Sequence, residues 1–288
     1  MTRRLLSAIA CLAMFGLVAG FFAPLHPSLD SLALLRPIFM AVCLIGVLAF
    51  KRSWLRRGVL AVLVVSFVTA IPMADLVPAS DDLRVYSKNL RYDNGQVEAL
   101  FEDIQSADAD VLMLQEVSSV NDTLLTRLNT TFPHQTRCST PAGVAIVVAS
   151  RFAFEGTPLC SERKALAVAK VAINAQSVWL ASVYIPWHWP IPSHINEKEA
   201  EDLLGSLKGP IVMAGDFNSV PWTRRVSRLK SLSRTRLAGP TFVTLRHKRL
   251  PLSIPIDFVF APGGGQVELR PLLGSDHHGL LAKVKLSR

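Results

Sequence analysis

Three long apolar runs occupy the first quarter of the chain. Residues 5–22 form an uncharged run of 18 residues, residues 32–50 are interrupted only by Arg36 and Pro37, and residues 58–74 form the third run. Each is close to the roughly 20 residues that a helix needs to span a bilayer. A cleaved signal peptide accounts for the first run alone, but not for three in succession. The pattern predicts a membrane anchor of three transmembrane helices within residues 1–76.

The hydrophobic pattern changes after residue 77 to short strand-like runs that alternate with amphipathic segments. Strands are predicted at 82–90, 111–117, 143–150, 164–173, 177–185, 210–215, 255–261, 266–272 and 280–286. Helices are predicted at 96–108, 121–132, 197–207 and 223–232. Because few strict strand-helix-strand repeats occur, we expect packed sheets with helices outside rather than a simple Rossmann sheet. Residues 77–288 are long enough for one domain of this kind.

Basic residues indicate how the apolar runs are oriented. Arg3 and Arg4 precede the first run, and four Lys or Arg residues lie between 51 and 57, whereas the loop at 22–31 contains none. The positive-inside rule therefore places the N-terminus and the second loop in the cytoplasm. With three crossings, the domain at 77–288 lies outside the cytoplasm.

The charge of the exported part is mildly basic. Seven Lys or Arg and two Asp or Glu residues precede residue 77, which leaves the remainder of the chain with a net charge of +4. Between Asn218 and Asp257 there are nine basic residues and no acid. Such a stretch favours an anionic partner, either a nucleic-acid backbone or anionic lipid headgroups, although a solvated surface is also consistent with it. We expect Arg224 and Arg225 to contact substrate.

The four cysteines divide between the two parts of the chain. Cys11 and Cys43 lie in the apolar runs, and Cys138 and Cys160 lie in the exported domain. An oxidising compartment favours a disulfide between Cys138 and Cys160 over two buried free thiols. Closing a loop of about 20 residues contributes about 3 kcal/mol in the chain-entropy model.

Polar residues occur where several predicted strands end. The stretch 209–222, GPIVMAGDFNSVPW, breaks from an apolar run into Asp216 and Asn218. Taken alone, this break is equally typical of an Asx turn before a helix and of a ligand site at a strand end. Similar residues recur near other strand ends: Asn89, Glu116, Asp257, Asp276 and His277. An oxygen-rich rim suits Mg²⁺, whereas no Cys or His cluster has the spacing of a zinc site.

These residues, taken in order, resemble the signature of the endonuclease/exonuclease/phosphatase superfamily. The motifs are Asn89, the pair Gln115-Glu116, the string Gly215-Asp216-Phe217-Asn218, the pair Ile256-Asp257 and the triplet Ser275-Asp276-His277. Any one of them is weak, but five in this order are specific, and the resemblance spans about residues 83–287. It implies a four-layer α/β sandwich, in which helices flank two packed mixed β-sheets, that hydrolyses phosphate esters with Mg²⁺ or with Mn²⁺ as a substitute. The three N-terminal runs further resemble membrane-anchored bacterial members, which implies a multi-pass protein of the inner membrane with a periplasmic catalytic domain.

The resemblance also implies roles for individual residues. Glu116 is the principal metal ligand, with Asn89 and Asp276 close to the metal. Asp216 orients or deprotonates the attacking water, and Asn218 holds that water or the phosphate. His277 donates to the phosphoryl oxygens, while Asp257 fixes its tautomer and charge. These roles suit phosphoryl transfer, which needs positioning and charge neutralisation more than covalent chemistry.

The sequence departs from the family pattern on the strand at 177–185. Tyr184 stands where many members have a histidine, and a phenol is a poorer proton donor than an imidazole. His188 follows four residues later and is equally consistent with a packing role. Trp187, with Trp189 and two prolines nearby, suits stacking on bases, insertion into a lipid surface or packing as a rigid rim loop.

Three functional interpretations remain open. The first is a membrane-anchored, Mg²⁺-dependent phosphodiesterase acting on DNA or RNA. The second is a phospholipid or sphingolipid phosphodiesterase, or another phosphatase, which the membrane anchor favours. The third is a non-catalytic binding module on the same scaffold, which Tyr184 alone supports.

Overall fold

The computed structural model describes residues 3–50, 52–71, 83–187, 193–246 and 253–287. Contacts within the chain divide it into two compact units. The first unit comprises Met1–Pro72 together with Trp187–His194 and Ser219–Ser227, and the second comprises Met73–Pro186, Ile195–Asn218 and Arg228–Arg288. The first unit therefore takes in two stretches of the predicted exported domain.

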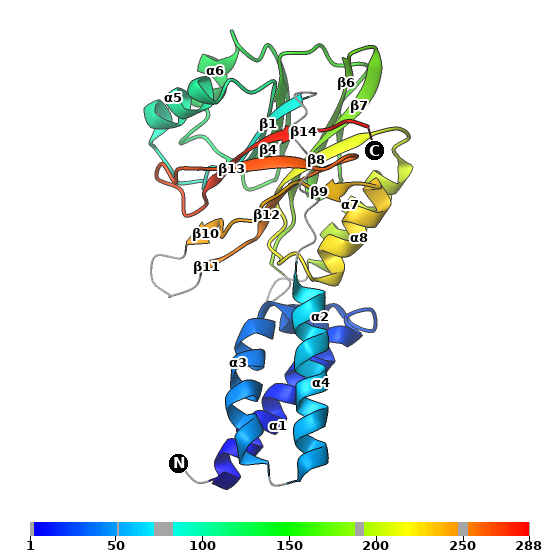
Figure 1. Ribbon diagram of the computed structural model, residues 1–288. Coiled ribbons are helices and arrows are strands. Elements are labelled where there is room, and N and C mark those ends of the chain that lie inside the picture. Colours follow the sequence, from blue (N-terminus) through cyan, green and yellow to red (C-terminus); the bar gives the residue numbers. More distant parts are fainter. Residues whose placement is uncertain (1–2, 51, 72–82, 188–192, 247–252, 288) are drawn as a thin grey trace. The chain divides into compact units, whose positions relative to one another are not determined.

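The N-terminal part of the first unit is helical. Its α-helices are α1 (Arg3–Ala19), α2 (Pro27–Leu34), α3 (Arg36–Gly46) and α4 (Ser53–Ala70), as shown in Figure 1. Two helical segments, Arg4–Phe22 and Ser53–Ala70, are long and apolar enough to span a membrane. The third span expected at 32–50 is not confirmed: this run is not one continuous helix, because α2 and α3 are bent by 65° at a break next to Arg36 and Pro37, and it qualifies only if the bent pair is counted as one span. The proline removes a backbone donor and clashes with the preceding turn, which explains the break.

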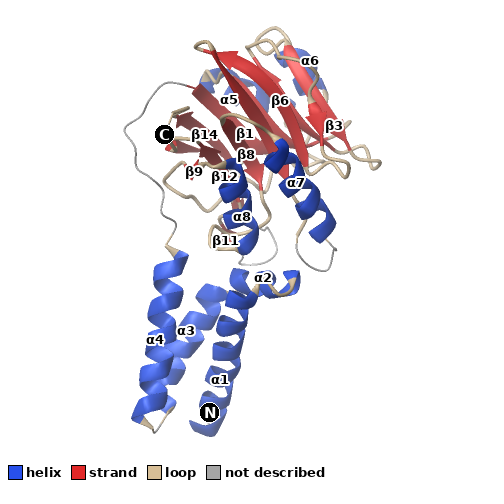
Figure 2. Cartoon of the chain, turned by 90° about the vertical axis from the view of Figure 1, so that its right-hand side faces the viewer, coloured by secondary structure: helices blue, strands red, loops and turns tan. Residues whose placement is uncertain are grey.

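The second unit contains two mixed six-stranded β-sheets flanked by helices, so the fold expected from the sequence is confirmed (Figure 2). The first sheet has the order β13-β14-β1-β2-β4-β3, and the second has the order β5-β6-β7-β8-β12-β9. The first comprises β1 (Leu83–Asn89), β2 (Val111–Val117), β3 (His134–Ser139), β4 (Ala145–Ser150), β13 (Gly265–Arg270) and β14 (Gly279–Val284). The second comprises β5 (Leu159–Cys160), β6 (Leu166–Ile173), β7 (Gln176–Tyr184), β8 (Ile211–Asp216), β9 (Arg236–Leu237) and β12 (Asp257–Ala261). The pattern missed β3 and the two-residue strands, which include β10 (Leu245–Arg246) and β11 (Ser253–Ile254).

Alternating side chains explain how the two sheets pack. Val85 and Met113 of the first sheet and Leu180 and Val212 of the second belong to one buried cluster between the sheets. The opposite face of the first sheet is covered by α5 (Val97–Ala107) and α6 (Thr123–Leu128), whose apolar residues join a second cluster. The remaining helices, α7 (His194–Ser206) and α8 (Arg224–Ser233), follow β7 and β8 in the chain. Period-two alternation within each strand thus supplies both apolar faces of the first sheet.

The predicted disulfide between Cys138 and Cys160 is present, with the two Cα atoms 5.7 Å apart. Cys138 lies on β3 and Cys160 on β5, the edge strands of the two different sheets. The bond therefore joins one edge of the first sheet to one edge of the second.

Candidate active site

The polar residues singled out in the sequence converge because their strands are neighbours. β8 lies between β7 and β12, so Tyr184 pairs with Asp216, and Asp216 pairs with Asp257. In the first sheet, Asn89 at the end of β1 pairs with Gln115, the residue before Glu116. Asn89 also donates to Asp216 across the two sheets, at 3.1 Å from Nδ2 to Oδ2. The rims of both sheets therefore meet at one site.

His277 lies between two buried aspartates. Its Nδ1 is 2.9 Å from Asp257 Oδ2, and its Nε2 is 3.9 Å from Asp216 Oδ2. Burial opposes the charged imidazole, but the negative charges of Asp257 and Asp216 outweigh it and raise the pKa of His277 to about 10. His277 is therefore a cation at neutral pH, with Nδ1 donating to Asp257.

Asp216 is held in place by amide donors. The backbone N–H of Asn218 donates to Oδ1 at 2.8 Å, and Nδ2 of Asn218 donates to Oδ2 at 3.0 Å. The stretch after β8 thus forms an Asx turn, and this turn places Asp216 among the other residues expected in the site. Burial raises the pKa of Asp216 to about 7, against the opposing effect of the His277 charge. A carboxylate with this pKa can accept a proton from water near neutral pH.

Glu116 is half-buried and is oriented by three groups. Asn89 Nδ2 donates to Oε1 at 3.0 Å, and the backbone N–H of Tyr92 donates to Oε2 at 3.2 Å. The Tyr184 hydroxyl also hydrogen-bonds Glu116, and burial together with the Glu116 charge raises the pKa of Tyr184. Tyr184 therefore acts here as an orienting donor to a carboxylate. Asn89 bridges Glu116 and Asp216 through its nitrogen, while its oxygen accepts from Arg91 N–H.

The backbone is unusual at several of these residues. Glu116 and Asn218 have φ values of +55° and +45°, in the left-handed region that non-glycine residues rarely adopt. The register between β2 and β4 shifts between Leu114 and Val117, and this irregularity turns Glu116 out of the ladder. At Gly215, φ is +144° and a Cβ would lie 2.1 Å from the Val183 carbonyl oxygen. Only glycine fits between β8 and β7 at this point.

Other residues support the site but were not singled out in the sequence. Thr244 Oγ1 accepts from the backbone N–H groups of Ile256 and Asp257. Lys88 is 1% exposed and donates from Nζ to the carbonyl oxygens of Pro271 and His277. Burial lowers the pKa of Lys88 to about 8. No spacing marks Thr244 or Lys88 in the sequence, because the bonds of Thr244 are to backbone amides and the partners of Lys88 lie 183 and 189 residues along the chain.

Ser275 belongs to the Ser275-Asp276-His277 triplet, and its hydroxyl links two parts of the site. Its Oγ donates to the Asn89 carbonyl oxygen and accepts from His277 N–H. Asp276 is half-buried, and its charge raises the pKa of both Tyr184 and His277, so it lies close to them.

The donor set fits a divalent cation. Among the described residues, Asp216, Asp257 and His277 place ligand atoms within 4.8 Å of one another. His277, however, is engaged with Asp257 and carries a proton on each ring nitrogen when charged, so its Nε2 has no free lone pair for a metal. Glu116 and Asp276 offer half-buried carboxylates beside this cluster, where a cation keeps some of its waters. A cation there would also offset the repulsion among the neighbouring acids.

The residues expected to contact substrate differ in accessibility. Arg225 is fully buried, and its Nη2 donates to Ser193 Oγ at 2.6 Å, so its side chain does not face solvent. Arg224 and Trp187 are half-buried. His188 and Trp189, like Lys248 and Arg249 of the basic stretch, lie outside the described residues.

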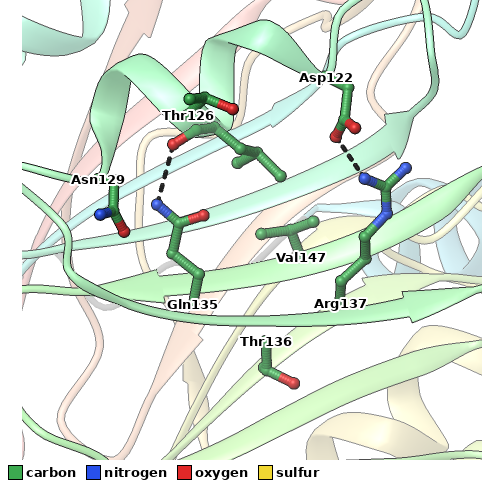
Figure 3. Close-up of a pocket in the computed structure, with 8 residues that line it drawn as sticks. Asp122, Thr126, Asn129, Gln135, Thr136, Arg137 and Val147 are labelled. Atoms are coloured by element: carbon green, nitrogen blue, oxygen red, sulfur yellow. Dashed lines mark hydrogen bonds and ion pairs between the residues drawn. The ribbon is translucent and has the colours of Figure 1, made fainter.

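A separate cavity of about 440 Å³ lies beside α6, β3 and β4 (Figure 3). Its lining includes Thr126, Asn129 and Gln135, and an ion pair between Arg137 and Asp122 borders it. None of the residues expected in the active site lines it.

Two stacked sheets with carboxylates, an amide and a charged histidine at one rim define a class of proteins that act on phosphate esters. Residues 85–277 match the Endonuclease/Exonuclease/phosphatase family, and the chain belongs to that family. Members of the family are generally metal-dependent phosphoester hydrolases.

The chain is also similar to individual proteins. A UPF0294 protein of Erwinia tasmaniensis is 27% identical over 196 residues, which cover 61% of this chain and 71% of the relative. An endonuclease/exonuclease/phosphatase from Bacteroides vulgatus has a similar structure, with a TM-score of 0.59, 16% identity and coverage of 72% of this chain and 100% of its own. A beta toxin mutant from Staphylococcus aureus with bound magnesium ions has a TM-score of 0.54 and 12% identity, and covers 71% of this chain and 100% of its own. At such identities the structural similarities show the fold alone.

Proposed function

We propose that this protein is a membrane-anchored, Mg²⁺-dependent phosphodiesterase with an extracytoplasmic catalytic domain. The main support is the arrangement around Asp216, in which a buried carboxylate with a pKa of about 7 lies beside the charged imidazole of His277. One group accepts a proton and the other stabilises negative charge, and the hydrolysis of a phosphodiester needs both. A binding module has no need of such a pair, and Tyr184, the one residue in favour of that interpretation, is occupied in orienting Glu116.

The residues divide the reaction between them. Asp216, fixed by Asn218 and Asn89, orients a water molecule and takes its proton as the water oxygen attacks phosphorus. The bond from phosphorus to the leaving oxygen breaks, and that oxygen departs with the electron pair and takes a proton from solvent. His277 donates a hydrogen bond to the phosphoryl oxygens as their charge develops. Glu116 and Asp276 would hold the cation, and Asn89 positions the Glu116 carboxylate. When bound there, Mg²⁺ would supply positive charge that neutralises the phosphate.

Nucleic acid is the first candidate substrate. The basic stretch after Asn218 favours it, because Lys230, Arg234 and Arg236 have exposed side chains. A phospholipid or sphingolipid is the second candidate, favoured by the two helical segments that are long and apolar enough to span a membrane. The buried state of Arg225 reduces the number of cations available to a nucleic-acid backbone.

The experiment uses the full chain in detergent micelles, with Mg²⁺ or with EDTA. The substrates are supercoiled DNA, single-stranded DNA, RNA and vesicles that contain sphingomyelin or phosphatidylcholine. Asp216→Ala and His277→Ala are the inactive variants, and Asp202→Asn, an exposed carboxylate on α7, is the matched control. Mg²⁺-dependent nicking that both variants lack supports a nuclease, and lipid hydrolysis without nicking supports the second candidate. No hydrolysis of any substrate by the wild type would contradict the proposal.

A further inference from the structure

A buried carboxylate of the N-terminal part accepts hydrogen bonds from the first residues of α8. Asp30 on α2 is only 3% exposed, and its Oδ1 accepts from Arg224 N–H at 2.8 Å. Its Oδ2 accepts from Arg225 N–H at 3.1 Å. Arg224 and Arg225 are the first two residues of α8, so Asp30 satisfies two of the amide groups that a helix leaves without an intrahelical partner.

The sequence of α8 explains why it needs a carboxylate from elsewhere. The helix has no acid in its first turn, and it begins with two arginines, whose charge is unfavourable at the positive end of the helix dipole. The side chain of the preceding Thr223 accepts a long hydrogen bond from Val226 N–H, at 3.4 Å to Oγ1. Asp30 provides both the acceptor oxygens and the negative charge that this helix end lacks.

A second hydrogen bond joins α2 to the stretch before α8. The indole Nε1 of Trp222 donates to the Ala33 carbonyl oxygen at 2.8 Å, and Ala33 lies one turn after Asp30 on α2. Asp30, Ala33, Trp222 and the two arginines all belong to the first compact unit. The contact requires α2 and Ser219–Ser227 to lie on the same side of a membrane. The distribution of Lys and Arg independently predicts that the loop at 22–31 and the domain after residue 77 share a side.

The stretch held by Asp30 begins directly after the site. Ser219 follows Asn218, and the connection to α8 is closely packed, with Ser219 and Thr223 at 0% exposure and Val220 at 1%. Because this connection is short and buried, we expect a shift of the first residues of α8 to displace Asn218. Because Asn218 holds both oxygens of Asp216, a shift at this point misplaces the group that orients water.

We propose that Asp30 is a positioning residue, which caps α8 and thereby holds the Asp216–Asn218 turn in its active geometry. The effect on catalysis rests on the proposed function, whereas the capping does not. The N-terminal part is thus more than a tether, since one of its carboxylates supports the site.

Hydrogen exchange tests the capping without any assay of activity. The full chain in detergent micelles is compared with Asp30→Ala, Asp30→Asn and the control Asp202→Ala, with peptides that cover residues 208–218 and 219–233. We expect amides in 219–233 to exchange at least tenfold faster in Asp30→Ala than in the wild type. Their exchange rate in Asp30→Asn should be intermediate, because asparagine keeps one acceptor oxygen. The rate in Asp202→Ala should match that of the wild type. Unchanged exchange in 219–233 would overturn the proposal. If Asp30→Ala does not fold, Asp30→Asn and Trp222→Phe, which loses the indole donor and part of the ring, decide in the same way.

Kinetics test the positioning. With the substrate that the wild type hydrolyses, Asp30→Ala is expected to lower kcat about tenfold with little change in KM, and Asp30→Asn to restore part of it. Faster exchange with an unchanged kcat would overturn the positioning role. A wild type without activity would contradict the proposed function, and exchange in 208–218 would then decide whether Asp30 holds the turn.

Discussion

At the scale of single residues, the site depends on how each buried acid is compensated. Asp216 receives three donors from two asparagines and lies near His277, whereas Asp257 pairs directly with His277. Donors and a cationic neighbour favour a charged carboxylate, while burial opposes it. The balance leaves Asp216 with a pKa of about 7 and His277 with one of about 10.

Asp257→Asn is expected to lower the pKa of His277, because it removes the charge that most favours the imidazolium. In metal-free protein, NMR titration of the wild type should show His277 protonated until about pH 10, and the variant should titrate at lower pH. The raised pKa stabilises the fold fully below pH 6.5, the ordinary value, and this contribution is lost as pH rises through about 10. Asp202→Asn serves as the control. An unchanged His277 titration in Asp257→Asn would show that this pair does not set its charge.

Gly215→Ala is expected to destabilise the protein by more than about 2 kcal/mol, because the added methyl group meets the Val183 carbonyl oxygen at 2.1 Å. Gly205→Ala on α7 is the matched control. Its methyl group meets only Leu232 at 3.8 Å, and alanine favours a helix by up to about 1 kcal/mol. Thermal unfolding of the two variants measures the difference, and equal melting temperatures would contradict this account of Gly215.

At the scale of elements, two features hold the strands and helices of the second unit together. The Cys138–Cys160 bond joins the edge strands β3 and β5. Three polar residues join β1, α5 and β13: Tyr86 Oη donates to Asp103 Oδ2 at 2.7 Å, and Arg270 Nη2 donates to Asp103 Oδ1 at 2.6 Å. Both features connect elements that are distant in sequence.

The double variant Cys138→Ala/Cys160→Ala is expected to lose about 3 kcal/mol of stability, since it frees a loop closed over a separation of 22 residues. Urea unfolding with and without a reductant measures this loss. Reductant should destabilise the wild type and leave the double variant unchanged. If reductant has no effect on the unfolding of the wild type, the bond contributes no stability.

Asp103→Ala is expected to cost about 2–3 kcal/mol, because it leaves a half-buried guanidinium and a buried hydroxyl without their shared carboxylate. Tyr86→Phe removes one hydrogen bond and should cost about 1 kcal/mol. Urea unfolding of the two variants tests the order of these losses. A larger loss for Tyr86→Phe would contradict the central role of Asp103.

At the scale of the whole molecule, the number of membrane crossings must be consistent with the contacts between segments that are distant in the chain. The contact between Asp30 and the start of α8 requires an even number of crossings between residues 34 and 77. Because α4 is long and apolar enough to cross by itself, the shorter α3 must cross as well to meet this requirement.

We expect the full chain to remain with membranes in a carbonate wash, and a cysteine at Ser28 to react with an impermeant thiol reagent from outside intact cells. A cysteine at Ser53 should react only after the membrane is opened. Both variants are made in a background with Cys11 and Cys43 replaced by alanine. Labelling of Ser53→Cys from outside, or release of the chain by carbonate, would contradict the proposed topology.

The sequence by itself determined the strands around the site, the packed sheets and the family. It could do so because strand periodicity and the polar residues at strand ends, such as Asp216 and Glu116, are local signals. The predicted disulfide also followed from the sequence, since Cys138 and Cys160 are the only cysteines after residue 77.

Only the tertiary structure decided which partners those residues have. The sequence could not show that Asn89 bridges Glu116 and Asp216, that Arg225 is buried, or that the apolar run at 32–50 bends at Arg36. Thr244 and Asp30 escaped notice for the same reason. A residue's partners and its pKa depend on groups brought near by the packing of distant segments, and the local pattern of the chain does not record that packing.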